Sequence, residues 1–153
     1  MQIYLATTPE NLREALRYTD RAAHVAYRVG RDGHLTRQNL LARTQGGLMV
    51  LGDQDCGAIR DAGALVREVW RECGNRGFPG VLADFEQPPS ADRTAFLEAL
   101  STVLARNNRA LFVPEAYGHQ VPRARVLICT AISGGTLRTR LEEAAGTFGI
   151  QRL

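Results

Sequence analysis

Short runs of apolar residues recur along the chain, and amphipathic helical patterns lie between them. Apolar runs of this length, bounded by turn residues, are typical of buried strands. We therefore expect six strands, within residues 3–6, 23–29, 47–51, 80–85, 111–113 and 126–132.

The clearest helical pattern covers residues 61–74, where apolar side chains recur at three- and four-residue steps and charged residues occupy the other positions. A second helix is expected to begin at Ser90, after two prolines, and to end at Asn107-Asn108. A third should follow Gly134-Gly135, and Thr8-Pro9 should begin a short first helix.

The alternation of strands and helices predicts an α/β fold with a parallel sheet, because parallel neighbours need crossover connections. The sheet is expected to be a partial or truncated TIM (β/α) barrel, and an open doubly wound sheet is the alternative. Residues 149–153 look like the start of a seventh strand, whereas a complete barrel typically needs about 250 residues. No linker or fixed-period repeat divides residues 1–153, so a single domain is expected.

The composition narrows the function. The chain has 153 residues, of which 44% are hydrophobic and 23% charged, as is usual for one globular domain. Its formal charge is +3, but the arginines are scattered and few aromatic residues lie among them, so nucleic-acid binding is not indicated. The chain contains no lysine, which excludes Schiff-base chemistry and a phosphate-loop lysine.

Cysteine usage and hydropathy bear on the compartment. The three cysteines, Cys56, Cys73 and Cys129, are far apart and form neither a disulfide framework nor a zinc motif. The first residues lack the pattern of a secretory leader, and no apolar run is long enough to span a membrane. We expect a cytoplasmic protein without a membrane partner.

The most informative stretch is 80–86, an apolar strand that ends in Asp84 and Glu86. Side chains alternate in a strand, so these two carboxylates point the same way, with Cα atoms roughly 6.6 Å apart. Two carboxylates in one pocket push their pKa values apart, which can keep one protonated for general-acid catalysis. The alternative is structural, with one carboxylate paired to an arginine and the other capping the next helix.

This stretch resembles the fourth-strand signature of glycoside hydrolase family 18, including its spore-cortex and germination hydrolases, which ends in Asp-aromatic-Glu. The resemblance implies that Glu86 is the general acid and that Asp84 orients the acetamido group of the substrate, which acts as the nucleophile. Pro79 and Leu82 stand where the family usually has two further aspartates. The run that ends in Asp53 also lacks the family's serine and paired glycines.

Polar residues follow other predicted strands and predict a pocket at their carboxyl ends. We expect these to line a substrate site: Asp53, Glu115, Tyr117, His119 and Ser133. For Tyr117, packing of the ring at the rim is an equally good interpretation. Asp53 and Asp55 alone make a poor metal signature, so we expect no metal and no cofactor. His24 and His34, the latter in a polar loop, are expected to be structural.

Residues 133–136, Ser-Gly-Gly-Thr, end the sixth strand and open a helix. Backbone N–H groups there can bind a phosphate, although an ordinary glycine turn is the favoured interpretation.

Three hypotheses follow. The first is a glycoside hydrolase-like protein that acts on an amino-sugar or cell-wall glycan, with Glu86 as acid. The second is a non-catalytic, barrel-like scaffold that binds a glycan or a protein. The third is an enzyme that binds a phosphorylated metabolite at 133–136. An incomplete barrel exposes strand edges, so a homo-oligomer or a longer parent chain is expected.

Overall fold

The computed structural model describes residues 5–6, 22–23, 27–37 and 48–127. Six strands form one sheet in the order β4-β3-β5-β6-β7-β8, and β1 pairs with β2 in a separate parallel ladder. All neighbours in the larger sheet are parallel except β3 and β4. The strands are β1 (Leu5–Ala6), β2 (Ala22–Ala23), β3 (Tyr27–Val29), β4 (Leu35–Arg37), β5 (Met49–Gly52), β6 (Gly80–Asp84), β7 (Ala110–Pro114) and β8 (Arg125–Leu127).

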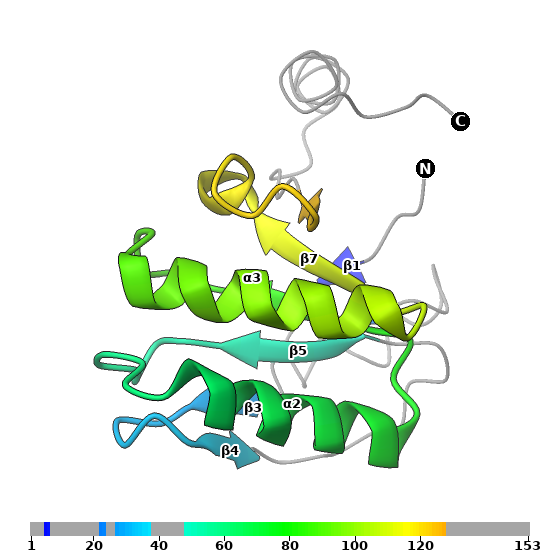
Figure 1. Ribbon diagram of the computed structural model, residues 1–153, viewed down its shortest axis with the longest axis horizontal. Helices are drawn as coiled ribbons and strands as arrows, with labels where there is room; N and C mark the ends of the chain where they lie inside the picture. The colour runs from blue at the N-terminus through cyan, green and yellow to red at the C-terminus, as the bar shows by residue number, and fades with distance from the viewer. Residues whose placement is uncertain (1–4, 7–21, 24–26, 38–47, 128–153) are drawn as a thin grey trace.

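Two helices, α2 (Ala62–Arg76) and α3 (Ala91–Arg106), lie side by side in front of the sheet (Figure 1). They connect β5 to β6 and β6 to β7, so each is the crossover between parallel neighbours. Among the described strands of this sheet, the parallel ones follow one another in chain order, without the reversal that characterises a doubly wound sheet. In the part of the chain that the structure describes, both helices cover the same face of this sheet.

The helix ends follow from local chemistry. Asp61 is the N-cap of α2 and accepts a hydrogen bond from the backbone N–H of Ala64 at 2.8 Å. Gly77 ends α2 with φ of 69°, a left-handed conformation that favours glycine. Ser90 precedes α3, and its hydroxyl bonds to the carboxylate of Asp92 instead of capping the backbone.

Strand alternation gives the sheet two apolar faces. The helix-side face belongs to the main core, which includes Tyr27, Leu51, Ala83 and Val113 together with the buried stripes of α2 and α3. A smaller cluster on the opposite face contains Leu48, Val50, Leu82 and Phe112. Both faces of the sheet are therefore buried at these residues, as in a parallel sheet of an α/β protein.

Gly80 allows close approach between β6 and β7. A Cβ atom at this position would lie 2.5 Å from the carbonyl oxygen of Ala110 and 3.2 Å from Leu48. The glycine that begins the apolar stretch before Asp84 therefore has a packing reason to be there.

The structure adds one element that the sequence analysis did not predict, the antiparallel strand β4, which forms a hairpin with β3. His34 lies in the polar loop of this hairpin, directly before β4, as expected. Gly33 adopts φ of 81°, and the backbone N–H of Gly30 donates to the carbonyl of His34 at 2.9 Å, which closes the turn. Asp-Gly is a recognised signal for a hairpin turn. The strand that follows it has only three residues, so the sequence pattern did not predict the hairpin.

The other predicted elements agree with the structure where it describes them. The predicted strand at 23–29 contains parts of both β2 and β3, and each of the other five overlaps one observed strand. The predicted helices at 61–74 and from Ser90 correspond to α2 and α3. The predicted first and third helices and the start of a seventh strand lie outside the described residues. None of the helices within the described ranges is long and apolar enough to cross a membrane.

Candidate active site

Asp84 and Glu86 lie close together at the carboxyl end of β6. Asp84 is the last residue of β6 and is half-buried, whereas Glu86 is exposed. Phe85 between them points into the helix-side core, where its ring stacks on Phe96 with centroids 6.2 Å apart. Asp84 alternates with Ala83 along β6 and therefore faces away from the helices. Glu86 lies two residues beyond the end of the strand.

The electrostatics of the two carboxylates differ. Burial raises the pKa of Asp84, and the nearby carboxylates of Glu86 and Asp53 raise it further. Glu86 accepts a hydrogen bond at Oε1 from the side-chain amide of Gln54 at 2.7 Å. Among the ion pairs between described residues, none includes Asp84 or Glu86.

Asp53 lies directly after β5 and is fully buried. Its Oδ2 accepts a hydrogen bond from Nε of Arg93 at 3.0 Å, and its Oδ1 accepts from the backbone N–H of Glu86 at 2.8 Å. The same Oδ1 receives the N–H of Gln87 at 3.4 Å. We expected Asp53 to line a substrate site, but its carboxylate is enclosed by protein and holds the backbone of Glu86 in place.

Gln87 and Arg93 complete this buried network, and the sequence analysis did not identify either of them. Gln87 donates through Nε2 to the carbonyl oxygens of Asp53 and Cys56, at 2.8 and 2.9 Å. Arg93, on the first turn of α3, donates to Gln87 Oε1 at 2.8 Å and to two carbonyls of the loop after β5. Three segments are joined here: the β5–α2 loop, the β6–α3 loop and α3.

Tyr117 is also a buried structural residue. It lies in a short 3-10 helix, Glu115–Tyr117, that follows β7, and its side chain is fully enclosed. Its hydroxyl donates to the carbonyl oxygen of Gln87 at 2.7 Å, and burial raises its pKa to about 12. The ring of Tyr117 is therefore packed inside the protein, as one of the two sequence interpretations has it, and its hydroxyl is bonded to the loop that carries Glu86.

The remaining predicted site residues are Glu115, His119 and Ser133. Glu115 is half-buried and His119 is exposed, and both follow β7 at the same end of the sheet as Asp84. Ser133 lies outside the described residues. No group of three or more His, Cys, Asp or Glu side chains in the described ranges has a geometry that would hold a metal ion.

A row of residues crosses the sheet at the level of Asp84. Arg28 of β3 is in register with Gly52 of β5, and Gly52 is in register with Asp84 of β6. Their chain neighbours Tyr27, Leu51 and Ala83 belong to the helix-side core, so Arg28 and Asp84 share the opposite face. Gly52 separates them without a side chain.

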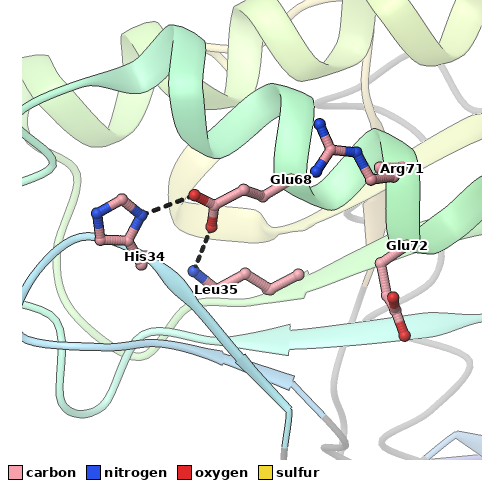
Figure 2. Close-up of a pocket in the computed structure, with 5 residues that line it drawn as sticks. All are labelled: His34, Leu35, Glu68, Arg71 and Glu72. Carbon is pink, nitrogen blue, oxygen red and sulfur yellow. Dashed lines mark hydrogen bonds and ion pairs between the residues drawn. The ribbon is translucent and has the colours of Figure 1, made fainter.

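Figure 2 shows a pocket elsewhere on the molecule, between the β3–β4 hairpin and α2. Its volume is about 440 Å³, and it is lined by His34, Leu35, Glu68, Arg71 and Glu72. Glu68 accepts hydrogen bonds from the backbone N–H of Leu35 and contacts Nδ1 of His34, both at 2.7 Å. Asp84 and Glu86 do not line this pocket.

Comparison with known proteins supports the fold. No family model and no curated protein matches the chain. Solved structures do match, at low identity. The spore cortex-lytic enzyme SleL of Bacillus megaterium QM B1551 aligns with a TM-score of 0.64 and 18% identity over 94% of this chain and 46% of its own. A class V chitinase of Pseudomonas fluorescens Pf-5 aligns with a TM-score of 0.61 and 19% identity over 88% of this chain and 58% of its own.

A chitinase of Chromobacterium violaceum ATCC 12472 aligns with a TM-score of 0.53 and 15% identity, over 78% of this chain and 50% of its own. This chain thus spans about half the length of these proteins. At such identities the likeness concerns the fold, which is that of chitinase and cortex-lytic glycoside hydrolases.

Proposed function

We propose that the chain is a glycoside hydrolase-like protein of the family 18 type that acts on an amino-sugar or cell-wall glycan, with Glu86 as the general acid. The observation that carries this proposal is that Asp84 and Glu86 lie together at the carboxyl end of β6, close enough for the charge of Glu86 to raise the pKa of Asp84. Active sites of (β/α) barrels lie at the carboxyl ends of the strands. The likeness in fold to a spore cortex-lytic enzyme and to a chitinase supports the proposal.

The proposal includes a barrel-like architecture. The parallel strands follow chain order, and the described helices cover one face, as in a segment of a (β/α) barrel. Leu82, Val50 and Phe112 would then form a layer of the barrel interior below Asp84. A homo-oligomer or a longer parent chain remains our proposal for completing the sheet, and light scattering during size-exclusion chromatography tests it.

In the proposed reaction, Glu86 protonates the glycosidic oxygen while the acetamido oxygen of the substrate attacks the anomeric carbon. Asp84 would bind the acetamido N–H, and its raised pKa means that it keeps its proton to higher pH than an ordinary aspartate. The buried network around Asp53 supports this arrangement because it fixes the backbone N–H of Glu86. Preorganisation of this kind is what places a general acid within reach of its substrate.

The decisive experiment measures hydrolysis of a chromogenic amino-sugar oligosaccharide by the full chain. Glu86→Gln should lower kcat by about 10²–10⁴-fold, the usual contribution of a general acid. Glu98→Gln changes the charge equally at an exposed position of α3 and should leave kcat unchanged. Full activity in the Glu86→Gln variant would rule out the assignment.

A specific observation favours the non-catalytic alternative. Leu82, which stands where the family usually has an aspartate, is buried in the apolar cluster opposite the helices. Position 82, two residues before Asp84 in β6, therefore has no carboxylate that could share a proton with Asp84. Binding of an amino-sugar oligosaccharide in calorimetry, without hydrolysis after long incubation, would favour the scaffold. The phosphometabolite hypothesis rests on residues 133–136, which lie outside the described residues.

A further inference from the structure

Gln54 is hydrogen-bonded to the carboxyl group of the candidate acid. Its side-chain amide donates through Nε2 to Oε1 of Glu86 at 2.7 Å, from a position 32 residues earlier in the chain. Both residues are exposed, so this bond lies at the protein surface, where Glu86 would meet a substrate. Gln54 therefore contacts the group that is proposed to transfer a proton.

The turn that carries Gln54 is held on both sides. The carbonyl oxygen of Asp53 accepts the backbone N–H of Cys56 at 3.0 Å, and the Asp53 carboxylate accepts the backbone N–H of Glu86 at 2.8 Å. On the other side, Asp55 forms an ion pair with an arginine of β3 at 3.3 Å. Two consecutive residues thus contact Glu86: Asp53 bonds to its backbone and Gln54 bonds to its carboxyl group.

The hydrogen bond from Gln54 distinguishes the two oxygens of the Glu86 carboxyl group. An amide N–H group donates and cannot accept, so the oxygen that it contacts is an acceptor in both states of the carboxyl. When Glu86 is protonated, its proton must therefore lie on the other oxygen, Oε2. The bond from Gln54 can persist while that proton is transferred, and a general acid depends on being held within reach of its substrate.

We propose that Gln54 is a positioning residue for the candidate acid, which holds Oε1 of Glu86 as an acceptor and so leaves Oε2 to deliver the proton. The Oε2–H bond breaks and the proton passes to the glycosidic oxygen. That oxygen leaves the anomeric carbon as part of an alcohol, and the acetamido oxygen takes its place. Glu86 remains as a carboxylate that still accepts the N–H of Gln54. This inference rests on the proposed function, because it requires Glu86 to be the acid.

Two substrates with different leaving groups test the inference. An N-acetylglucosamine oligosaccharide releases a sugar alcohol and needs a proton from an acid, whereas its dinitrophenyl glycoside releases a stable phenolate and needs none. The measured quantity is kcat/KM, which covers the steps up to the departure of the leaving group. Gln54→Met removes the amide at nearly constant length. It should lower kcat/KM about tenfold for the oligosaccharide and less than about twofold for the dinitrophenyl glycoside.

Two further variants separate this role from a general defect. Gln54→Asn keeps an amide but shortens its reach, so it should show the same loss for the oligosaccharide alone. Asn75→Leu removes an exposed amide near the carboxyl end of α2, and it should leave both values unchanged. In the Glu86→Gln background, Gln54→Met should change the residual kcat/KM less than about twofold, because residues that act as a unit are not additive.

The outcomes distinguish this inference from the proposed function. An unchanged kcat/KM in Gln54→Met, equal losses for the two substrates, or a loss that adds to that of Glu86→Gln would overturn the role of Gln54 and leave the proposed function intact. If the wild-type chain hydrolyses neither substrate, or if Glu86→Gln remains fully active on the oligosaccharide, the proposed function fails and this inference fails with it.

Discussion

The Nε of Arg93 lies 3.0 Å from Oδ2 of Asp53, and both side chains are almost completely enclosed by protein. The two residues are 40 positions apart in the sequence, at the start of α3 and just after β5. The second oxygen of Asp53 accepts the backbone N–H of Glu86. The ion pair therefore ties the candidate acid to the helix that follows it.

Replacement of Arg93 by methionine should be strongly destabilising. The variant leaves the carboxylate of Asp53 buried without its counter-charge, and breaking a buried pair from one side typically costs about 3–5 kcal/mol. Equilibrium unfolding in urea measures the loss. Arg106→Met, at an exposed position, should change the free energy of unfolding by less than about 0.5 kcal/mol.

A double-mutant cycle separates the ion pair from the other bonds of these residues. Asp53→Asn with Arg93→Met should cost clearly less than the two single costs added together, because no unpaired charge remains buried. Additive costs would show that Asp53 and Arg93 do not stabilise each other.

Tyr117→Phe isolates a single hydrogen bond to the loop that carries Glu86. The variant removes the hydroxyl that donates to the Gln87 carbonyl at 2.7 Å and keeps the ring that packs edge-on against Phe85. We expect a loss of about 0.5–1.5 kcal/mol in the free energy of unfolding. Tyr117→Ala, which also removes the ring, should lose about 3–5 kcal/mol. Equal losses in the two variants would mean that the hydroxyl, and not the ring, carries the stability.

The sequence predicted the elements that depend on local pattern. The apolar stripe of α2 and the break before Ser90 are signals within a few residues, and the structure agrees with both. Strand alternation predicted a shared orientation of Asp84 and Glu86, but β6 ends at Asp84, so the pattern fixes the direction of Asp84 alone. The β3–β4 hairpin was missed although Asp32-Gly33 is a hairpin turn signal, because strand β4 has only three residues and little apolar character.

The roles of Asp53 and Tyr117 depended on tertiary contacts that no local pattern carries. An acidic residue at a strand end is equally compatible with substrate binding and with a buried bond to a distant arginine. In the structure Asp53 contacts Arg93 and Gln87, which lie more than 30 residues away in the sequence. A local sequence pattern cannot predict contacts over such a separation.

Gly80→Ala tests whether the first glycine of the β6 stretch is structural. The new methyl group would lie 2.5 Å from the backbone oxygen of Ala110, so the two strands must separate, at a cost of about 1–3 kcal/mol. The same substitution at Gly74 in α2 meets only the end of the Arg109 side chain, at 4.0 Å. Gly74→Ala should therefore stabilise the chain by about 0.5–1 kcal/mol. Thermal unfolding of both variants checks the opposite signs.

The His34–Glu68 contact predicts a pH-dependent attachment of the hairpin to α2 (Figure 2). The hydrogen bond and charge of Glu68 raise the pKa of His34, and the carboxylates of Asp32 and Asp61 add to the effect. A raised pKa in the folded state means that the stabilisation is fully present below the unfolded pKa of about 6.5. It is lost as the pH rises through the higher folded value. His34 is exposed, so the effect should be small and should weaken with salt.

Thermal midpoints of the wild-type chain and of His34→Gln, measured from pH 5 to pH 9, should differ at the acidic end and converge at the alkaline end. Glu68 also accepts the backbone N–H of Leu35, so Glu68→Gln should lower the midpoint across the whole range. A difference for His34→Gln that grows with pH would contradict the assigned sign.

Asp84→Asn should increase the free energy of unfolding at neutral pH. The pKa of Asp84 is raised by burial and then by Glu86 and Asp53, so its ionised form is less favourable in the folded chain than in the unfolded one. Below the unfolded pKa, about 3.9, both states hold the proton and no cost arises. As the pH rises through the unfolded and then the folded pKa, the wild-type chain loses stability that the asparagine variant keeps.

Urea unfolding should therefore find Asp84→Asn more stable than the wild type at pH 7, with the gain much reduced at pH 3. Asp55→Asn, at an exposed carboxylate paired with Arg28, should show no such gain at pH 7. If Asp84→Asn were less stable than the wild type at pH 7, Asp84 would be a stabilising group of the fold, and its proposed role in binding the substrate would lose this support.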